Sequence, residues 1–214
     1  MKASASDIIV ALSRKNCAAD DALDFDWDGA IRYLRQLRAS LAPKGRIDPP
    51  HDGVKASEYI AFVPTPMRVV HRMLEMAEIK AGETVYDLGC GDGRILISAA
   101  RKYRAHGVGV EIDSERIDHA RRQAGEFAGS IKFMRQNIFK TDLRRADVVM
   151  IYLLPGLNAK LMPRLRRLRW GVRVVSHNFK LPGTAPYKVA RVKAPDGSTH
   201  EIFAYRSPLR RVIE

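Results

Sequence analysis

Cysteine, long apolar runs and clustered metal ligands are scarce in this chain of 214 residues. Its two cysteines are Cys17 and Cys90, and because Cys90 lies inside a glycine-rich turn, we expect no structural disulfide and a reducing, cytoplasmic compartment. The apolar run at 8–12 is too short for a membrane span or for the core of a signal peptide. The six histidines show no metal-ligand spacing, so we expect no bound metal. No nucleophilic triad is visible either. These absences argue against secreted, membrane-spanning and metal-dependent proteins.

Negative charge is also scarce over most of the chain. The formal net charge is +13, yet residues 1–58 contain nine basic and nine acidic residues, so the whole excess lies in residues 59–214. A basic surface suits nucleic acid or an acidic protein surface. The alternative is that many of the arginines only solvate the outer faces of helices. The charge therefore allows an RNA partner without identifying one.

What the chain does contain is a glycine-rich stretch at 84–97, TVYDLGCGDGRILI. Residues 84–88 predict a short buried strand, Gly89, Gly91 and Gly93 predict a turn that no side chain crowds, and an apolar helical pattern begins at Arg94. A helix start offers free N–H groups, and glycines let a ligand approach the backbone. This combination predicts a site for the polar part of a nucleotide-like ligand.

Spacing and charge decide between two such ligands. Dinucleotide-binding turns usually follow G-x-G-x-x-G, whereas this turn runs G-x-G-x-G. Carboxylates at Asp87 and Asp92 would repel a pyrophosphate and attract a cation. These features favour S-adenosylmethionine (SAM), which carries an amino group and a sulfonium, over NAD. The remaining alternative is a plain glycine turn in another α/β protein.

Strand and helix patterns alternate along the rest of the chain. Strand patterns lie at 84–88, 108–111, 131–135, 146–152 and 173–176, and then at 187–192 and 201–205 on either side of a Pro-Asp-Gly turn signal at 195–197. We therefore predict an α/β fold, a Rossmann-like, doubly wound, mostly parallel seven-stranded sheet with a C-terminal antiparallel hairpin. Helices are expected after an N-cap at Thr65 with Pro66 in the first turn, after an N-cap at Ser114, and over 159–168.

The first 57 residues differ in pattern from the rest of the chain. Residues 1–42 repeat apolar side chains at helical spacing, and residues 43–57 contain several prolines and glycines. We predict an N-terminal helical extension and linker at 1–57 and a ligand-binding domain at 58–214. The extension is expected to pack on that domain or on a second copy of it, and the oligomeric state is left open.

Ligands of a doubly wound sheet bind beyond the carboxyl ends of its strands. Glu111 ends the second strand, 24 residues after Asp87, at the place where an acid takes the ribose hydroxyls in nucleotide-binding units. Asn137 follows the third strand and is either an adenine contact or a plain turn residue. Tyr152 and His177 end the fourth and fifth strands, so the predicted site residues gather at one edge.

Five short motifs stand out over about residues 58–205. They are FVPTP (62–66), VYDLGCGDGRI (85–95), GVEID (109–113), YLLPGLN (152–158) and VVSHNF (174–179). Together they resemble the class I, seven-strand SAM-dependent methyltransferases, and among these the protein-lysine N-methyltransferases of archaeal and mitochondrial type. After the fourth strand, YLLPG stands in place of the Asn-Pro-Pro-Tyr type of signature found in base or glutamine amino-methylation.

The resemblance implies SAM as cofactor and S-adenosyl-L-homocysteine as product. It implies that Tyr59, Pro64 and Thr65 close over the cofactor, although this segment also fits an ordinary start of a helix. It further implies that Asp87 and Gly89 hold the methionyl part, Glu111 the ribose and Asn137 the neighbourhood of the adenine. The predicted cofactor set also includes Cys90, Gly91, Asp92, Gly93, Ile112, Ile138, Tyr152 and Leu153.

Methyl transfer from a sulfonium is an in-line displacement, so the enzyme mainly aligns the nucleophile and excludes water. A lysine ammonium must first lose its proton, and an apolar channel beside a sulfonium lowers its pKa by desolvation and like charge. We expect Tyr152 and Leu153 to form the wall of that channel, and Asn158 and His177 to bind or position the acceptor. Tyr152, Asn158 and His177 are thus the predicted catalytic residues, with a purely structural role as the alternative for His177.

Three functions remain open from the sequence. The first is a protein-lysine methyltransferase, which acts on a protein substrate. The second keeps the chemistry but acts on RNA, which the charge of +13 favours because lysine-rich targets would be repelled. The third is a SAM-binding regulator without turnover.

Overall fold

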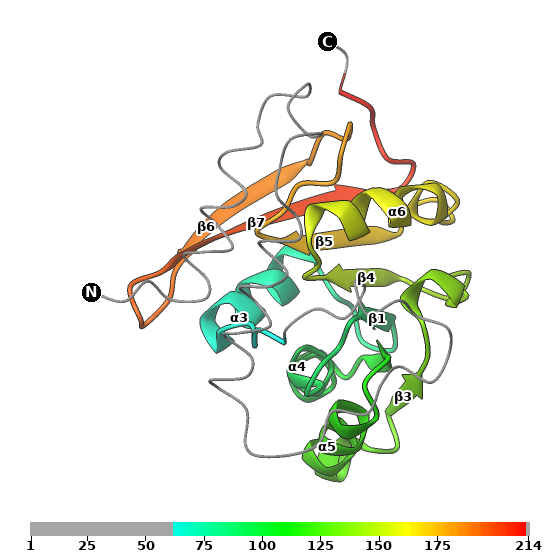
Figure 1. The fold of residues 1–214 in the computed structure, drawn as a ribbon, viewed down its shortest axis with the longest axis vertical. Coiled ribbons are helices and arrows are strands. Elements are labelled where there is room, and N and C mark those ends of the chain that lie inside the picture. Colours follow the sequence, from blue (N-terminus) through cyan, green and yellow to red (C-terminus); the bar gives the residue numbers. More distant parts are fainter. Residues whose placement is uncertain (1–61, 213–214) are drawn as a thin grey trace. The chain divides into compact units, whose positions relative to one another are not determined.

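The computed structural model describes residues 62–212 (Figure 1). The predicted extension at 1–57, the predicted boundary at 57–58 and Tyr59 lie outside the described residues and stay predictions. The chain divides between Val63 and Pro64, and the unit that begins at Pro64 contains all the strands and helices of the described residues.

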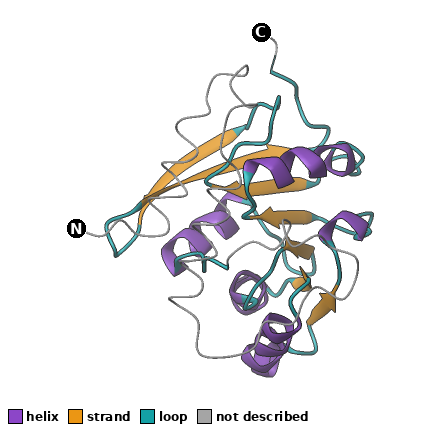
Figure 2. Ribbon diagram, in the orientation of Figure 1, coloured by secondary structure: helices purple, strands orange, loops and turns teal. Residues whose placement is uncertain are grey.

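A seven-stranded sheet forms the centre of this unit (Figures 1 and 2). Its strands, in spatial order, are β3 (Ile131–Arg135), β2 (His106–Glu111), β1 (Thr84–Leu88), β4 (Val148–Ile151), β5 (Arg173–His177), β7 (Thr199–Arg206) and β6 (Lys188–Lys193). The first five are parallel, and β7 pairs antiparallel with both β5 and β6. This arrangement confirms the predicted fold class. It also brings the carboxyl ends of β1, β2, β4 and β5 to one edge.

Helices cover both faces of the sheet. Three of them, α3 (Met67–Met76), α4 (Arg94–Tyr103) and α5 (Ser114–Ala124), pack on one face, and α6 (Pro155–Leu165) packs on the other. Neighbouring residues of β4 alternate between the two cores: Val148 belongs to the first and Val149 to the second. Short 3-10 helices at Gly125–Phe127 and Ile138–Lys140 complete the helical structure of the described residues.

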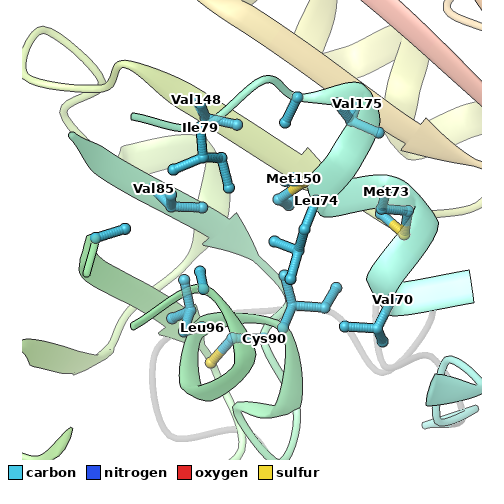
Figure 3. Close-up of a cluster of buried hydrophobic side chains, with 14 of the residues drawn as sticks. Val70, Met73, Leu74, Ile79, Val85, Cys90, Leu96, Val148, Met150 and Val175 are labelled. Carbon is cyan, nitrogen blue, oxygen red and sulfur yellow. The ribbon is translucent and has the colours of Figure 1, made fainter. Parts of the chain in front are cut away.

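Figure 3 shows the core beneath α3 and α4. Leu74 of α3 and Leu96 of α4 meet Val85 and Met150 of the central strands there. The side chain of Cys90, inside the glycine turn, belongs to the same cluster and is buried. The hydrophobic core thus extends to the predicted cofactor loop, which packs on it through the side chain of Cys90.

The predicted helix starts needed correction. Pro66, not Thr65, is the N-cap of α3, and no side chain of the described residues caps that helix. Asp113, not Ser114, caps α5, because its carboxylate accepts hydrogen bonds from the N–H groups of Glu115 and Arg116. The helix expected at 159–168 starts earlier and ends earlier, at Pro155–Leu165, with proline at its first position. None of the helices within residues 62–212 has the length and apolarity to cross a bilayer.

Candidate active site

The turn between β1 and α4 requires its glycines. Gly89, Gly91 and Gly93 all have positive φ angles, of 85°, 53° and 78°. A Cβ atom on Gly93 would lie only 2.8 Å from Cζ of Phe133, which belongs to β3. The turn therefore packs tightly against the sheet on its inner side, and Gly89 is exposed on its outer side.

Glu111 fastens this turn to the end of β2. Its Oε2 accepts a hydrogen bond from the N–H of Gly91 at 3.2 Å, and its Oε1 accepts from the N–H groups of Ile112 and Asp113 at 2.8 and 3.1 Å. The guanidinium of Arg116 lies 3.8 Å from Oε1. Glu111 is buried at the predicted edge, and its contact with the ribose stays a prediction.

Asp87 has an unusually high pKa for an aspartate. Its side chain is only 3% exposed, and burial together with the carboxylates of Asp92 and Glu111 raises its pKa to about 8. Every cause of this pKa shift among the described residues disfavours the ionised form. A buried carboxyl in such surroundings fits a cationic ligand, which would restore its charge.

Asp92 differs from Asp87 in having a basic partner. Both of its carboxylate oxygens accept hydrogen bonds from Nε of Arg94, each at 2.9 Å. Arg94 also donates through Nη1 to the backbone oxygen of Thr65 at 2.9 Å. Arg94 therefore ties the glycine turn to the segment before α3, which is the segment predicted to close over the cofactor.

Tyr152 and His177 form an aromatic wall at the ends of β4 and β5. Their ring centroids are 3.9 Å apart, and Phe179 stacks on Tyr152 from 6.4 Å. Burial raises the pKa of Tyr152 to about 12, and burial together with His200 holds the pKa of His177 well below its usual value. Both rings are thus neutral near pH 7.

Asn158 in the first turns of α6 is fully buried. Within the described part of the chain, neither its Oδ1 nor its Nδ2 has a hydrogen-bond partner. A buried amide without partners costs stability, and a bound ligand or water is among the groups that would satisfy it. This position is consistent with a role for Asn158 in positioning the acceptor, and that role stays a prediction.

The remaining predicted residues take less central positions. Leu153 reaches the glycine turn, because its Cδ2 lies 3.3 Å from where a Cβ on Gly89 would be. Asn137 accepts a hydrogen bond from the N–H of Phe139 at 2.8 Å, which is the turn role weighed as its alternative. Pro64 is exposed, and Ile112 and Ile138 are half-buried. Their contacts with the cofactor stay predictions.

Cys90 can contribute only through its backbone, because its side chain fills the core. Its Sγ lies 2.8 Å from where a Cβ on Gly109 would be, and burial raises the pKa of the thiol well above its usual value. A reactive thiolate is therefore excluded here.

The sequence reasoning missed several polar residues behind the aromatic wall. Asn178 has a positive φ of 61°, and its side chain donates to the hydroxyl of Tyr152 at 3.5 Å. His200, Ser198 and Asp196 extend from His177 toward the tip of the β6–β7 hairpin. Asparagine favours the left-handed region, which is a usable signal for Asn178. The other three are brought to His177 by the pairing of β5 with β7.

The described residues fit a cationic nucleoside ligand. The glycine turn leaves exposed backbone at Gly89, and Asp87 lacks a compensating positive charge. Among residues 62–212, no group of three or more His, Cys, Asp and Glu side chains is arranged to hold a metal ion.

Comparisons with known proteins agree with this geometry. A family model described as the ANTKMT methyltransferase domain matches residues 87–188. The chain is 41% identical over 152 residues to a protein-lysine N-methyltransferase of Saccharolobus islandicus (strain REY15A), a match that covers 69% of this chain and 93% of that protein. It is 31% identical over 165 residues to the adenine nucleotide translocase lysine N-methyltransferase of Mus musculus, with 72% of each chain covered.

A solved structure described as an RNA methyltransferase from Salinibacter ruber, in complex with S-adenosyl-L-homocysteine, is also similar. It has a TM-score of 0.65 and 41% sequence identity, and the match covers 71% of this chain and 97% of that one. SAM is accordingly the cofactor of this enzyme. Because the Saccharolobus relative is matched over nearly its whole length, the chain belongs to the protein-lysine N-methyltransferase family of class I SAM-dependent methyltransferases.

Proposed function

We propose that this enzyme transfers a methyl group from SAM to the ε-amine of a lysine in a protein substrate. When bound, SAM supplies a methyl group on a positively charged sulfur. The observation that carries the lysine acceptor is the neutral wall of Tyr152 and His177 at the carboxyl ends of β4, which pairs with β1, and β5, which pairs with β4. The two lysine methyltransferase relatives support the same acceptor.

On the cofactor side, the chain binds and orients. Asp87 offers a buried carboxylate to a cationic group, and the glycine turn offers exposed backbone at Gly89. The link from Asp92 through Arg94 to Thr65 holds the segment before α3 close to the turn. In-line displacement depends on such fixed positions, because alignment supplies most of the rate.

On the acceptor side, the protein desolvates the substrate lysine and favours its uncharged amine form. A lysine ammonium against the half-buried ring of Tyr152, with the fully buried, neutral ring of His177 behind it, loses hydration without gaining a counter-ion from either ring. Its pKa therefore falls toward neutrality. The unused amide of Asn158 supplies a carbonyl that accepts a hydrogen bond from the amine and so fixes the direction of its lone pair. These roles support Tyr152, His177 and Asn158 as acceptor-binding residues.

RNA is a second candidate substrate. The net charge of +13 favours it, and the Salinibacter ruber structure is described as an RNA methyltransferase. The neutral wall of Tyr152 and His177 favours lysine, because an ammonium must be deprotonated before it can react.

Transfer of radiolabelled methyl groups from SAM to a cell extract tests the proposal. We expect label that protease removes and ribonuclease leaves, and the reverse pattern would replace lysine by RNA as the acceptor.

The Asp87→Asn variant should transfer no label. The matched variant Asp142→Asn, at an exposed carboxylate before β4, should transfer as much as the wild type. Absence of label with the wild type in every extract would contradict the proposed activity.

A further inference from the structure

A continuous line of hydrogen bonds runs from the active site to the protein surface. It joins Thr65 Oγ1 to Nδ1 of His177 (3.4 Å), Nε2 of His177 to Nδ1 of His200 (2.9 Å), Nε2 of His200 to Oγ of Ser198 (2.8 Å), and Oγ of Ser198 to Oδ1 of Asp196 (2.5 Å). We call these five residues the relay. The two imidazoles are fully buried, Thr65 and Ser198 are buried, and Asp196 is exposed. The relay thus connects a closed interior to water.

The fold places each member of the relay. His177 of β5 pairs with Ile202 of β7, and His200 stands two residues before Ile202 on the same face. Ser198 and Asp196 lie in the turn between β6 and β7, where Oδ1 of Asp196 also accepts from the N–H of Ser198 at 2.9 Å. At the other end, the carbonyl of Thr65 accepts a hydrogen bond from Arg94, the first residue after the glycine turn, and its hydroxyl contacts Nδ1 of His177.

When both imidazoles are neutral, the chemistry of the end group fixes the direction of every hydrogen bond. An ionised carboxylate only accepts, so the single hydroxyl hydrogen of Ser198 goes to Asp196. Ser198 Oγ must then accept from Nε2–H of His200, which leaves Nδ1 of His200 as an acceptor. By the same reasoning His177 carries its hydrogen on Nε2, and its Nδ1 accepts from the hydroxyl of Thr65. All donors therefore point away from the active site toward Asp196.

Neutral imidazoles are needed for such an arrangement, since a doubly protonated ring has no acceptor. The pKa of His177 is held well below its usual value by burial and by His200, and hydrogen bonds from Ser198 hold the pKa of Asp196 below its usual value. Other elements bring two more titratable groups near: the neutral phenol of Tyr152 on the ring of His177, and Arg68 of α3, which donates to the backbone oxygen of Lys193 beside the hairpin turn. Neither group interrupts the relay.

We propose that the relay carries the proton of the substrate lysine from the active site to solvent, an inference that rests on the proposed lysine acceptor. The ammonium N–H bond breaks as its proton goes to Thr65 Oγ, and the amine keeps the electron pair that attacks the methyl group. The hydroxyl hydrogen of Thr65 passes to Nδ1 of His177. One hydrogen then moves along each of the three following hydrogen bonds, and Asp196 releases the last to water. The relay resets when both rings return to their Nε2–H forms.

Breaking the relay at Ser198 tests this proposal. In Ser198→Ala the Nε2–H of His200 loses its acceptor, so we expect kcat/KM for a lysine peptide to fall about tenfold at pH 7. At pH 9.5 the loss should shrink to about twofold, because more of the substrate arrives as free amine as the pH approaches the lysine pKa of about 10.4. Affinity for S-adenosyl-L-homocysteine should not change. Thr199→Ala, the exposed neighbour outside the relay, should match the wild type at both pH values.

An equal loss at both pH values would overturn the relay and leave Ser198 a structural role. A wild type that methylates no lysine would instead contradict the proposed function, so the two failures are distinguishable.

A measurement independent of activity is the ¹⁵N NMR spectrum of histidine-labelled protein without cofactor. We expect His177 and His200 both neutral and protonated at Nε2 at pH 7. A hydrogen on Nδ1 of either ring, or a charged ring, would also overturn the proposal.

Discussion

At the scale of single residues, the pocket holds a carboxyl group that is unfavourable in the free protein. The pKa of Asp87 is raised to about 8, whereas an exposed aspartate ionises near 3.8. Between these values the folded protein holds a proton that the unfolded chain has lost, so the contribution of Asp87 to stability falls as pH rises from about 4 to about 8. A cationic ligand beside Asp87 would favour the ionised carboxylate and offset this cost.

Replacing Asp87 by asparagine should therefore stabilise the free protein while it weakens the site. For Asp87→Asn we expect the free energy of unfolding at pH 8 to rise by up to roughly 5 kcal/mol, with most of the difference gone near pH 4, where the folded wild-type carboxyl is protonated. Affinity for S-adenosyl-L-homocysteine should fall by about 100-fold or more. Urea unfolding and calorimetry measure the two effects. A variant that is less stable than the wild type at pH 8 would contradict the assignment.

The buried amide of Asn158 leads to a similar prediction. Asn158→Leu replaces two partnerless polar atoms by apolar ones of similar volume, so the free energy of unfolding should stay equal or rise by about 1 kcal/mol. Turnover of a lysine substrate should fall at least about tenfold, with affinity for S-adenosyl-L-homocysteine unchanged. If the substitution destabilises the fold by more than about 1 kcal/mol, the amide is structural.

At the scale of elements, the glycine turn lets β1 and α4 pack closely against β3 and α5, because Gly93 leaves room for side chains of those two neighbours. Gly93 lies at the start of α4, and a Cβ on it would meet Phe133 of β3 and Ala120 of α5. The turn therefore packs against side chains from both β3 and α5.

Alanine substitutions at three glycines separate backbone strain from steric conflict. Gly93→Ala should lower the free energy of unfolding by about 3 kcal/mol or more, because it combines a φ of 78° with the contact to Phe133. Gly82→Ala, with a φ of 79° and open space, should cost about 1 kcal/mol. Gly129→Ala, with open space and no positive φ, should cost nothing measurable. Equal losses at Gly93 and Gly82 would show that packing at the turn is unimportant.

The sequence predicted these elements well wherever local pattern decides them. Short apolar runs and the Pro-Asp-Gly signal predicted all seven strands, and the glycine spacing predicted the turn between β1 and α4. The helix starts were less predictable, because a side chain that can cap a helix can also bond to a residue far away in the sequence. Thr65 looks like an N-cap, yet its hydroxyl faces His177, 112 residues away. His200 meets His177 only through the β5–β7 register, which no local pattern contains.

At the scale of the whole molecule, part of the arginine content of the described residues is paired with acids on the surface. Several exposed arginines pair with acids that are near them in sequence, such as Arg121 with Asp118 and Arg144 with Asp142. These pairs support the interpretation that many arginines solvate the surface of the domain. Such exposed pairs contribute little stability and are weakened by salt.

The most direct test of lysine methylation is the chemical identity of the methylated product. Protein labelled by the wild-type enzyme with radioactive SAM is hydrolysed to amino acids, and the labelled amino acid is identified by chromatography beside authentic standards. We predict ε-N-methylated lysine with the wild type and with Asp142→Asn, and no labelled product with Asp87→Asn. Label recovered in a nucleoside, or in a methylated amino acid other than lysine, would contradict the proposed function.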